Sequence, residues 1–344
     1  MAAIKRFLRR DGKLWLLAAL FLIGPLPRLL AGMGLIGPQD WLPTHWLQRS
    51  TDIFIWAIFA LSYDLLLGFT GIVSFGHSLF MAVGSYAVAI GVMKLGFPLW
   101  AMILAALLAG ALISAVVGSL SLRLKGHGFA MITLAFAEVG HVLILKGSKI
   151  TGGEDGLSVT VPLWMASRIN GYYLALLGLI LAFILMRRIT RSQFGRVLAS
   201  IRENEDRAIA LGFNVTAYKV GALTLAGMIA AFAGVAQVTV GSRFAAASMA
   251  GSGPTIDVLL MTILGGVGTL TGPVVGAAIV RLLSYVLPSF ASASPLFARW
   301  PLLLGVIYIA TVMFLPAGVV GASSSRLKQV FGRLVPGSER KEAA

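Results

Sequence analysis

Few side chains in the apolar parts of this sequence could do chemistry. Asp64, His77, Glu138 and His141 fall within or at the edge of long apolar stretches, where a charge is costly and usually has a functional reason. Glu138 and His141 are three residues apart and therefore share one face of a helix. Either these side chains line a polar translocation path or relay protons, or Glu138 and His141 satisfy each other or backbone groups inside a helix bundle.

A second candidate is the polar and basic segment Arg187 to Lys219, which interrupts an otherwise apolar chain. Apolar residues recur in it at three- and four-residue spacing, which predicts a short amphipathic helix or a bent pair of helices. Ser192 and Asn204 are placed to cap two helix starts, and Gly212 can end the second helix. The apolar positions are Phe194, Val197, Leu198, Ile201, Ala208 and Leu211.

The polar face of this segment mixes acids with bases. Arg202 and Arg207 stand beside Glu203, Glu205 and Asp206, whereas a helix that lies on an anionic membrane surface would be mostly basic. The mixed charge therefore favours a protein partner over a lipid surface.

Several kinds of chemistry are missing from the sequence. It contains no G-x-x-x-x-G-K-[ST] phosphate loop, so the chain is not expected to bind ATP. It also has no His and carboxylate pair at metal-ligand spacing, and no cysteine for a disulfide or a thiolate site. We therefore expect a protein that is not an enzyme, binds no cofactor or metal, and depends on a separate subunit if ATP drives it.

The composition predicts the architecture that must position these residues. Of the 344 residues, 58% are apolar and 12% are charged, and the mean hydropathy is +0.90. A soluble domain carries about 25% charged residues, and roughly 20 apolar residues cross a bilayer. An all-α polytopic membrane protein is expected. Its net charge of +15 is explained by Lys and Arg in cytoplasmic loops, so no nucleic-acid partner is expected.

Hydropathy predicts eight to ten membrane spans, with one ambiguous apolar stretch at 254–287. The basic N-terminus is followed by a long apolar run without a small-x-small cleavage site, which predicts a retained first helix rather than a signal peptide. The clear spans are 14–31, 53–69, 76–93, 99–121, 128–145, 172–186, 220–240 and 300–318.

The distribution of Lys and Arg predicts the orientation. With the N-terminus inside, the segments 1–13, 122–127, 187–219 and 322–344 are all cytoplasmic, and they hold 19 of the 28 Lys and Arg, as the positive-inside rule requires. A cytoplasmic C-terminal tail then requires 254–287 to cross the membrane twice or not at all.

Two glycine-rich breaks interrupt the predicted helices, one within Leu65 to Phe80 and one at Gly265–Gly268 and Gly272–Pro273. The second predicts a re-entrant or hairpin element. In transporters the pathway lies where discontinuous helices meet, although close helix packing by small residues is an equal alternative. The candidate path residues are Gly71, Ser74, Gly76, His77, Glu138, Gly265, Gly266, Gly268 and Gly272.

Five stretches carry a family resemblance: DLLLGFTGIVSFGHSLFMAVGSY (64–86), LRLKGHGFAMITLAFAEV (122–139), TGGEDGLS (151–158), FGRVLASIRENEDRAIALGFNV (194–215) and LGGVGTLTGPVVGA (264–277). They resemble the permease subunits of branched-chain amino acid (Liv-type) ABC importers, specifically the LivM-like subunit. The resemblance covers most of residues 53–320 in the order found in that family.

The resemblance implies an assembly in a bacterial inner membrane. Its other members would be a homologous second permease subunit, two ATPase subunits that use the ATP, and an extracytoplasmic substrate-binding protein. Residues 14–321 would form the permease domain between two basic cytoplasmic termini, 1–13 and 322–344, and 187–219 would be the loop that sits on an ATPase. The expected coupling residues are Phe194, Gly195, Arg196, Arg202, Glu205, Arg207, Ala208 and Gly212.

The resemblance also implies branched-chain or related amino acids as substrates. Relatives carry urea, amides or small organic acids, so these substrates stay open. An ion-coupled secondary transporter or channel acting alone is an alternative, and it predicts transport by the purified chain driven by an ion gradient. A non-transporting membrane scaffold is another, and it predicts that Gly266→Leu is tolerated.

Overall fold

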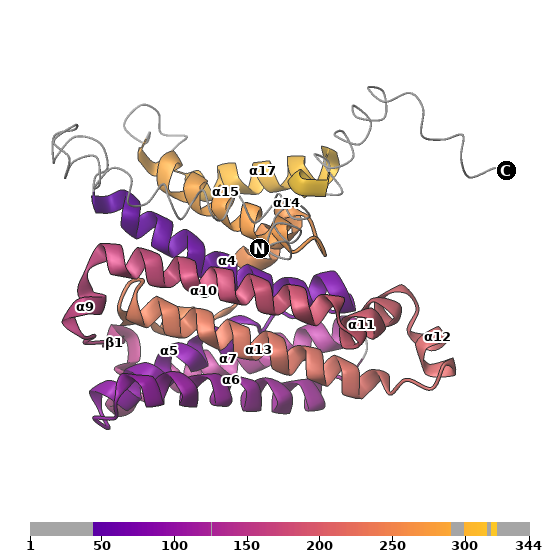
Figure 1. Cartoon of the computed structure of the whole chain (residues 1–344), viewed down its shortest axis with the longest axis horizontal. Coiled ribbons are helices and arrows are strands. Elements are labelled where there is room, and N and C mark those ends of the chain that lie inside the picture. Colours follow the sequence, from indigo (N-terminus) through magenta and orange to yellow (C-terminus); the bar gives the residue numbers. More distant parts are fainter. Residues whose placement is uncertain (1–43, 125, 290–298, 315–317, 322–344) are drawn as a thin grey trace, which may run out of the picture.

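The protein is almost entirely helical, as predicted, in a computed structural model of the chain (Figure 1). The first predicted span and both basic termini lie outside the described residues. The structure describes residues 44–124, 126–289, 299–314 and 318–321.

The helices follow one another along the chain with only two very short strands between them in the described part. The longer helices are α4 (Thr44–Thr70), α5 (Ser78–Met93), α6 (Leu99–Ser121), α7 (His127–Lys146), α10 (Arg168–Arg191), α11 (Gln193–Glu203), α13 (Val215–Thr239), α14 (Ser252–Gly265), α15 (Thr271–Ser289) and α17 (Trp300–Phe314). The short elements are α8 (Ser148–Thr151), η1 (Gly153–Asp155), β1 (Leu157–Ser158), α9 (Leu163–Ala166), α12 (Glu205–Ala210), β2 (Phe244–Ala245) and η2 (Ala247–Met249).

Six helices in the described part of the chain are long and apolar enough to cross a membrane, namely α4, α6, α7, α10, α13 and α15. The first five coincide with predicted spans. Helices α5 and α14 are apolar but have only 16 and 14 residues. At about 1.5 Å per residue they fall short of the roughly 30 Å hydrocarbon core, so neither helix is long enough to cross it alone.

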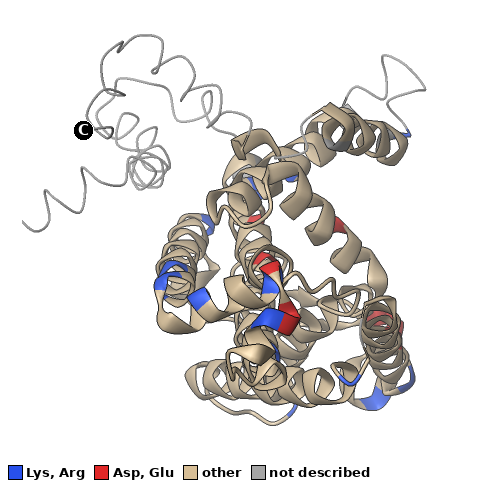
Figure 2. Cartoon of the chain, turned by 90° about the vertical axis from the view of Figure 1, so that its right-hand side faces the viewer, with Lys and Arg blue, Asp and Glu red and all other residues tan. Residues whose placement is uncertain are grey.

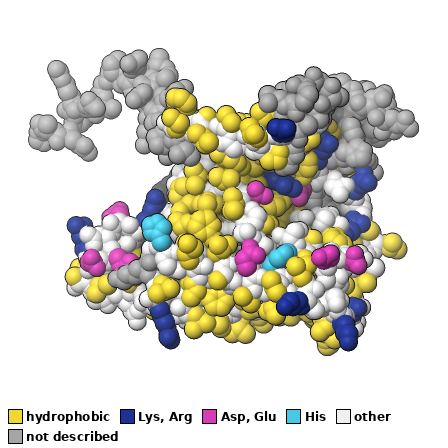
Figure 3. Space-filling model, turned by 180° about the vertical axis from the view of Figure 1, so that it is seen from behind, with side chains coloured by type: hydrophobic (Ala, Val, Ile, Leu, Met, Phe, Trp, Pro, Cys, Tyr) yellow, Lys and Arg dark blue, Asp and Glu magenta, His cyan; other side chains and the backbone are white. Residues whose placement is uncertain are grey.

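Helix α4 is the centre of the fold, with α10, α13 and α15 packed around it (Figure 1). In its most apolar 18-residue stretch 78% of the helix is buried, against 17% in α7. Ile55, Phe59 and Tyr63 are among the side chains of α4 that point into the core. On the back of the molecule an apolar face lies between charged ends, interrupted by a few acidic and histidine side chains (Figure 3). Lipid or a partner subunit would cover such a face.

The ambiguous stretch 254–287 forms a hairpin of α14 and α15. The predicted hairpin is therefore confirmed. The helices approach closely because Gly265 faces Gly272: a Cβ on Gly265 would lie 1.8 Å from the Gly272 carbonyl oxygen. Only one of the two predicted breaks in this stretch interrupts the helices. Pro273 lies in the first turn of α15, where a missing N–H costs little, so the helix runs through it.

The connection between α10 and α13 is shorter than the polar segment 187–219 predicted from the sequence. Helix α10 continues to Arg191 and α13 already begins at Val215, so both ends of the predicted segment belong to long helices. The remaining residues form α11 and α12, the predicted bent pair of helices. At the opposite end of the molecule, β1 pairs antiparallel with β2 and joins the loop after α7 to the loop after α13.

Candidate functional site

The site begins with the two capped helices α11 and α12. Ser192 Oγ accepts a hydrogen bond from Gly195 N at 3.3 Å, and Asn204 Oδ1 accepts one from Arg207 N at 2.9 Å, so both predicted N-caps are confirmed. Gly212 follows α12 with a φ of 85°, in the left-handed region that ends helices. The caps fix where each helix starts and therefore which residues face the body of the protein.

Arg202 connects α11 to the membrane-embedded helices. Its Nη1 donates a hydrogen bond to the carbonyl oxygen of Gly68, near the end of α4. A Cβ on Gly71 would lie 3.3 Å from Arg202 Cγ, and one on Gly268 would lie 3.1 Å from Arg202 Nη1. One side chain therefore touches α4, the break at residues 71–77 (the first break) and the break at 266–270 (the second break).

Asp64 holds the second break against α4. It is fully buried, and its Oδ1 accepts a hydrogen bond from Gly268 N at 2.7 Å. Its Oδ2 has no hydrogen-bond partner in the described structure. The loop itself depends on unusual backbone geometry, because Gly266, Gly268 and Leu270 have φ values of 122°, 76° and 56°. Glycine adopts such angles at little cost.

The first break is held by side chains of α4. Tyr63 Oη donates to the Ser74 carbonyl oxygen at 3.0 Å, and Ser62 Oγ lies 2.8 Å from His77 Nε2. Because Ser62 donates its proton to Phe59 O, it accepts from His77 Nε2–H. The imidazole ring is fully buried and stacks on Phe59 at 5.4 Å. Its Nδ1 has no partner among the described atoms.

The first break contacts α7, and the first residue of α5 beside it contacts the start of α14. Phe75 N donates to Thr133 Oγ1 at 3.2 Å, and Ser78 N donates to Thr255 Oγ1 at 2.9 Å. A Cβ on Gly76 would lie 2.0 Å from the Thr133 carbonyl oxygen. Ser74, Gly76 and His77 are therefore buried packing positions around an irregular segment, and Gly71 is the exposed one.

Glu138 and His141 do not pair with each other in the structure. Glu138 Oε1 accepts a hydrogen bond from Ser252 N at 3.2 Å, and His141 Nδ1 lies 2.8 Å from Ala247 O. The backbone of the segment that leads into α14 therefore provides both partners. Both side chains are half-buried, and they attach α7 to this segment.

A groove of about 710 Å³ opens where the α11–α12 end meets the first break. Its walls come from the first break, the α6–α7 connection, α11 and the first turn of α13. Gly71, Arg202 and Glu205 all line it, and so does Lys219, which forms an ion pair with Glu205 at 2.7 Å. The groove therefore brings one predicted path residue next to two predicted coupling residues.

The predicted coupling residues divide into an exposed and a supporting group. Figure 2, which looks at this end of the molecule, shows acidic and basic residues side by side at its centre. Arg196, Arg202, Arg207 and Gly212 are exposed. Phe194, Gly195, Glu205 and Ala208 are buried or half-buried; Phe194 stacks on Tyr218.

The sequence interpretation missed the apolar part of the exposed surface. Ile209, Leu211 and Phe213 are 52%, 65% and 36% exposed on and just after α12. Leu211 was expected on the buried stripe, which was wrong, because the bend at Asn204 turns α12 away from the axis of α11. Exposed apolar side chains beside charged ones are typical of a protein interface. The signal in the sequence was two large apolar residues flanking Gly212.

The arrangement connects the exposed helices α11 and α12 to the membrane-embedded helices. Among the described residues, no group of three or more His, Cys, Asp or Glu could hold a metal ion. The side chain of Arg202 joins the exposed helices α11 and α12 to the end of α4 and to the two breaks. A displacement of α11 would therefore reach both breaks.

Comparison with known proteins gives one family. A family model described as "Branched-chain amino acid transport system / permease component" matches residues 47–316. The LivM permease proteins of high-affinity branched-chain amino acid transport from Salmonella typhimurium and Escherichia coli K12 are each 26% identical, covering 83% and 81% of this chain and 72% and 71% of their own. A probable LivM of Methanocaldococcus jannaschii is 25% identical, covering 77% of this chain and 90% of its own.

Proposed function

The chain belongs to the branched-chain amino acid transport permease family, and we propose that it takes branched-chain or related amino acids across a bacterial inner membrane. As a permease subunit of an ABC importer it would form part of the translocation path and receive the force of ATP hydrolysis from separate ATPase subunits. The α11–α12 end would face the cytoplasm, in agreement with the seven Lys and Arg of 187–219 and the positive-inside rule.

The observation that carries the proposal is the position of Arg202. Its side chain lies between an exposed pair of helices and the ends of α4 and of the α14–α15 hairpin. An ATPase that docks on Arg207, Ile209, Leu211 and Phe213 would push α11 when its nucleotide site closes. Arg202 would transmit this push to the second break, whose irregular backbone can absorb the change in helix direction.

The remaining members of the assembly are proposed from the family to which the chain belongs. A homologous second permease subunit would cover the exposed apolar face of α7, which presents Met131, Val139 and Leu143. Two ATPase subunits would bind at the α11–α12 ends, and an extracytoplasmic binding protein would deliver the substrate at the opposite end.

The docking surface can be tested with Ile209→Glu and Leu211→Glu in one variant. Both side chains are exposed, so folding should be retained, while a charge in an apolar interface should prevent co-purification of the ATPase subunits. Leu163→Glu is the matched control, since Leu163 is 92% exposed at the opposite end. Normal ATPase binding by the double variant would contradict the proposal, as would ion-driven transport by the chain alone.

A further inference from the structure

A polar pocket lies at the end of the molecule opposite α11 and α12, outside the coupling site. Its volume is about 220 Å³, and Arg49 and Asp52 of α4, Gln237 of α13, Ser242 and Tyr285 of α15 line it. A second hollow of about 200 Å³ adjoins it through shared walls at Gln48, Gly241 and Ser242. The two linings together come from α4, α9, α10, α13 and α15 and from the loop after α13.

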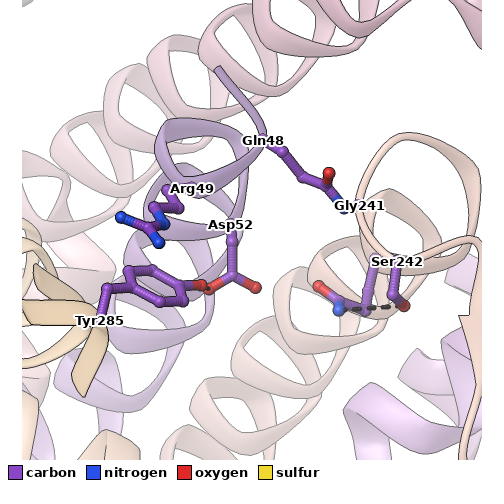
Figure 4. Close-up of a pocket in the computed structure, with 7 residues that line it drawn as sticks. Gln48, Arg49, Asp52, Gly241, Ser242 and Tyr285 are labelled. Atoms are coloured by element: carbon purple, nitrogen blue, oxygen red, sulfur yellow. Dashed lines mark hydrogen bonds between the residues drawn. The ribbon is translucent and has the colours of Figure 1, made fainter. Parts of the chain in front are cut away.

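One wall offers a carboxylate oxygen. Arg281 Nε and Tyr285 Oη both donate to Asp52 Oδ2, at 2.7 and 2.5 Å. No hydrogen bond reaches Asp52 Oδ1 within the described ranges. Figure 4 shows that the second carboxyl oxygen of Asp52 points away from Tyr285, toward the side where Ser242 lies. This oxygen is available to a donor inside the pocket.

The facing wall offers an amide oxygen. Gln237 is only 8% exposed; its Nε2 donates to Ser242 Oγ at 3.2 Å, and its Oε1 is buried with no partner in the described structure. A buried acceptor without a donor is costly. Gly241, which also lines the pocket, lies directly beside this oxygen: a Cβ there would lie 3.0 Å from Gln237 Oε1.

The third feature is a cation that forms no ion pair with any described residue. The guanidinium of Arg49 lies 5.3 Å from the ring centroids of both Trp46 and Tyr285. The two rings hold the charge in place through cation–π contacts but leave its hydrogen-bond donors for a planar anion. The pocket of about 220 Å³ thus combines one positive group with two acceptor oxygens, and Arg168 and Arg243 line the adjoining hollow.

We infer that this pocket binds a zwitterionic α-amino acid, with its carboxylate at Arg49 and its ammonium group at Asp52 Oδ1 and Gln237 Oε1. The inference rests on the proposed function and adds a substrate site on this subunit. A ligand with a carboxylate alone would leave both acceptor oxygens unpaired, and one with an ammonium alone would leave Arg49 unpaired. Only a ligand with both groups satisfies all three.

The test is equilibrium binding to the full-length chain in lipid nanodiscs, without binding protein. Three probes are compared: leucine, leucinamide, which lacks the carboxylate, and 4-methylpentanoate, which lacks the ammonium group. We expect saturable leucine binding and a roughly ten- to hundredfold weaker affinity for each analogue, as expected for the loss of a hydrogen bond to a charged group.

The variants assign each group to its partner. Arg49→Met should weaken leucine binding to about the level of leucinamide, with Arg49→Lys retaining part of the affinity, and Gln237→Leu should reduce the preference for leucine over 4-methylpentanoate. Lys149→Met, which removes an exposed charge at the same end, should bind like the wild type. Absence of saturable leucine binding overturns the inference, and so does unchanged binding by both pocket variants.

Two further measurements distinguish an amino-acid site from a contact for a partner protein, and binding from transport. If Arg49→Met weakens only the capture of an extracytoplasmic binding protein, a protein side chain occupies the pocket and the inference is wrong. If leucine binds as expected but reconstituted vesicles show no ATP-driven uptake, the site stands and the proposed function fails.

Discussion

The two glycine breaks differ in what holds them. The first break is fixed by side chains, since Tyr63, Ser62 and Thr133 reach it from α4 and α7. The second break is formed by backbone geometry and close glycine contacts, and Asp64 attaches it to α4 through a hydrogen bond to Gly268 N. We expect the first break to stay fixed and the second to act as a hinge, and Arg202 touches both.

The largest expected effect comes from filling the glycine contact at the hinge. Gly265→Ala places a Cβ 1.8 Å from the Gly272 carbonyl oxygen, so α14 and α15 must separate at a cost of about 3 kcal/mol or more. Substrate uptake should be lost, and thermal unfolding of the purified chain should occur at a clearly lower temperature.

Gly253→Ala is the matched control for this substitution. It lies in the same helix, and nothing lies within 4 Å of the Cβ it adds. Equal stability of the two variants would mean that the hairpin tolerates separation and that the second break is not built on this contact.

The next effect is expected at the residue that joins the breaks to α11. Arg202→Met keeps an aliphatic chain beside Gly71 but removes the donor to Gly68 O. Uptake should fall about tenfold, because a charge-assisted hydrogen bond contributes roughly 1.5 kcal/mol or more. ATPase subunits should still co-purify, because docking depends on other side chains. Loss of their binding in Arg202→Met would assign Arg202 to the interface instead.

A smaller effect is expected at the first break. Tyr63→Phe removes one hydrogen bond, to Ser74 O, while the bonds made by Ser62 and Thr133 remain. Unfolding free energy should fall by about 1 kcal/mol, and uptake should stay close to that of the wild type. A collapse of uptake in this variant would show that the first break moves during transport.

The smallest effect is expected at Glu138. Glu138→Gln keeps an oxygen for Ser252 N and removes the charge, so ATP-driven uptake should be unchanged and independent of the proton gradient. Glu138→Leu, which removes the acceptor, should be less stable. If Glu138→Gln abolishes uptake or makes it sensitive to the proton gradient, the side chain relays protons.

Much of the fold could be predicted from the sequence because spans and caps are local features. Five of the long helices follow from runs of apolar residues, and the starts of α11 and α12 follow from Ser192 and Asn204. The hairpin of α14 and α15 followed from counting crossings. The extent of each helix did not, because tertiary packing extends α10 and α13 into the polar segment.

The sequence predicted individual residues of the candidate site but not the contacts between them. Periodicity identified the segment that contains Arg202, but no local pattern indicates that its guanidinium reaches Gly68, 134 positions away in the sequence. The same holds for Glu138, whose partner Ser252 lies on a distant segment. The polar pocket at the end opposite α11 and α12 could not be predicted, because Asp52, Gln237 and Tyr285 are far apart in sequence and fall in different helices.

The most direct test of the central claim measures whether α11 and the second break move together. The chain has no cysteine, so spin labels can be placed at Glu203 of α11, Val267 of the second break and Leu124 across the groove. Distances are measured by pulsed electron paramagnetic resonance in the assembled importer, with and without trapped ATP.

We predict that ATP leaves the 203–267 distance unchanged and alters the 203–124 distance by several ångströms, the scale of hinge motions and helix shifts. With Arg202→Met the 203–267 distance distribution should broaden. A 203–267 distance that changes as much as 203–124 would contradict the claim that α11 carries the second break with it.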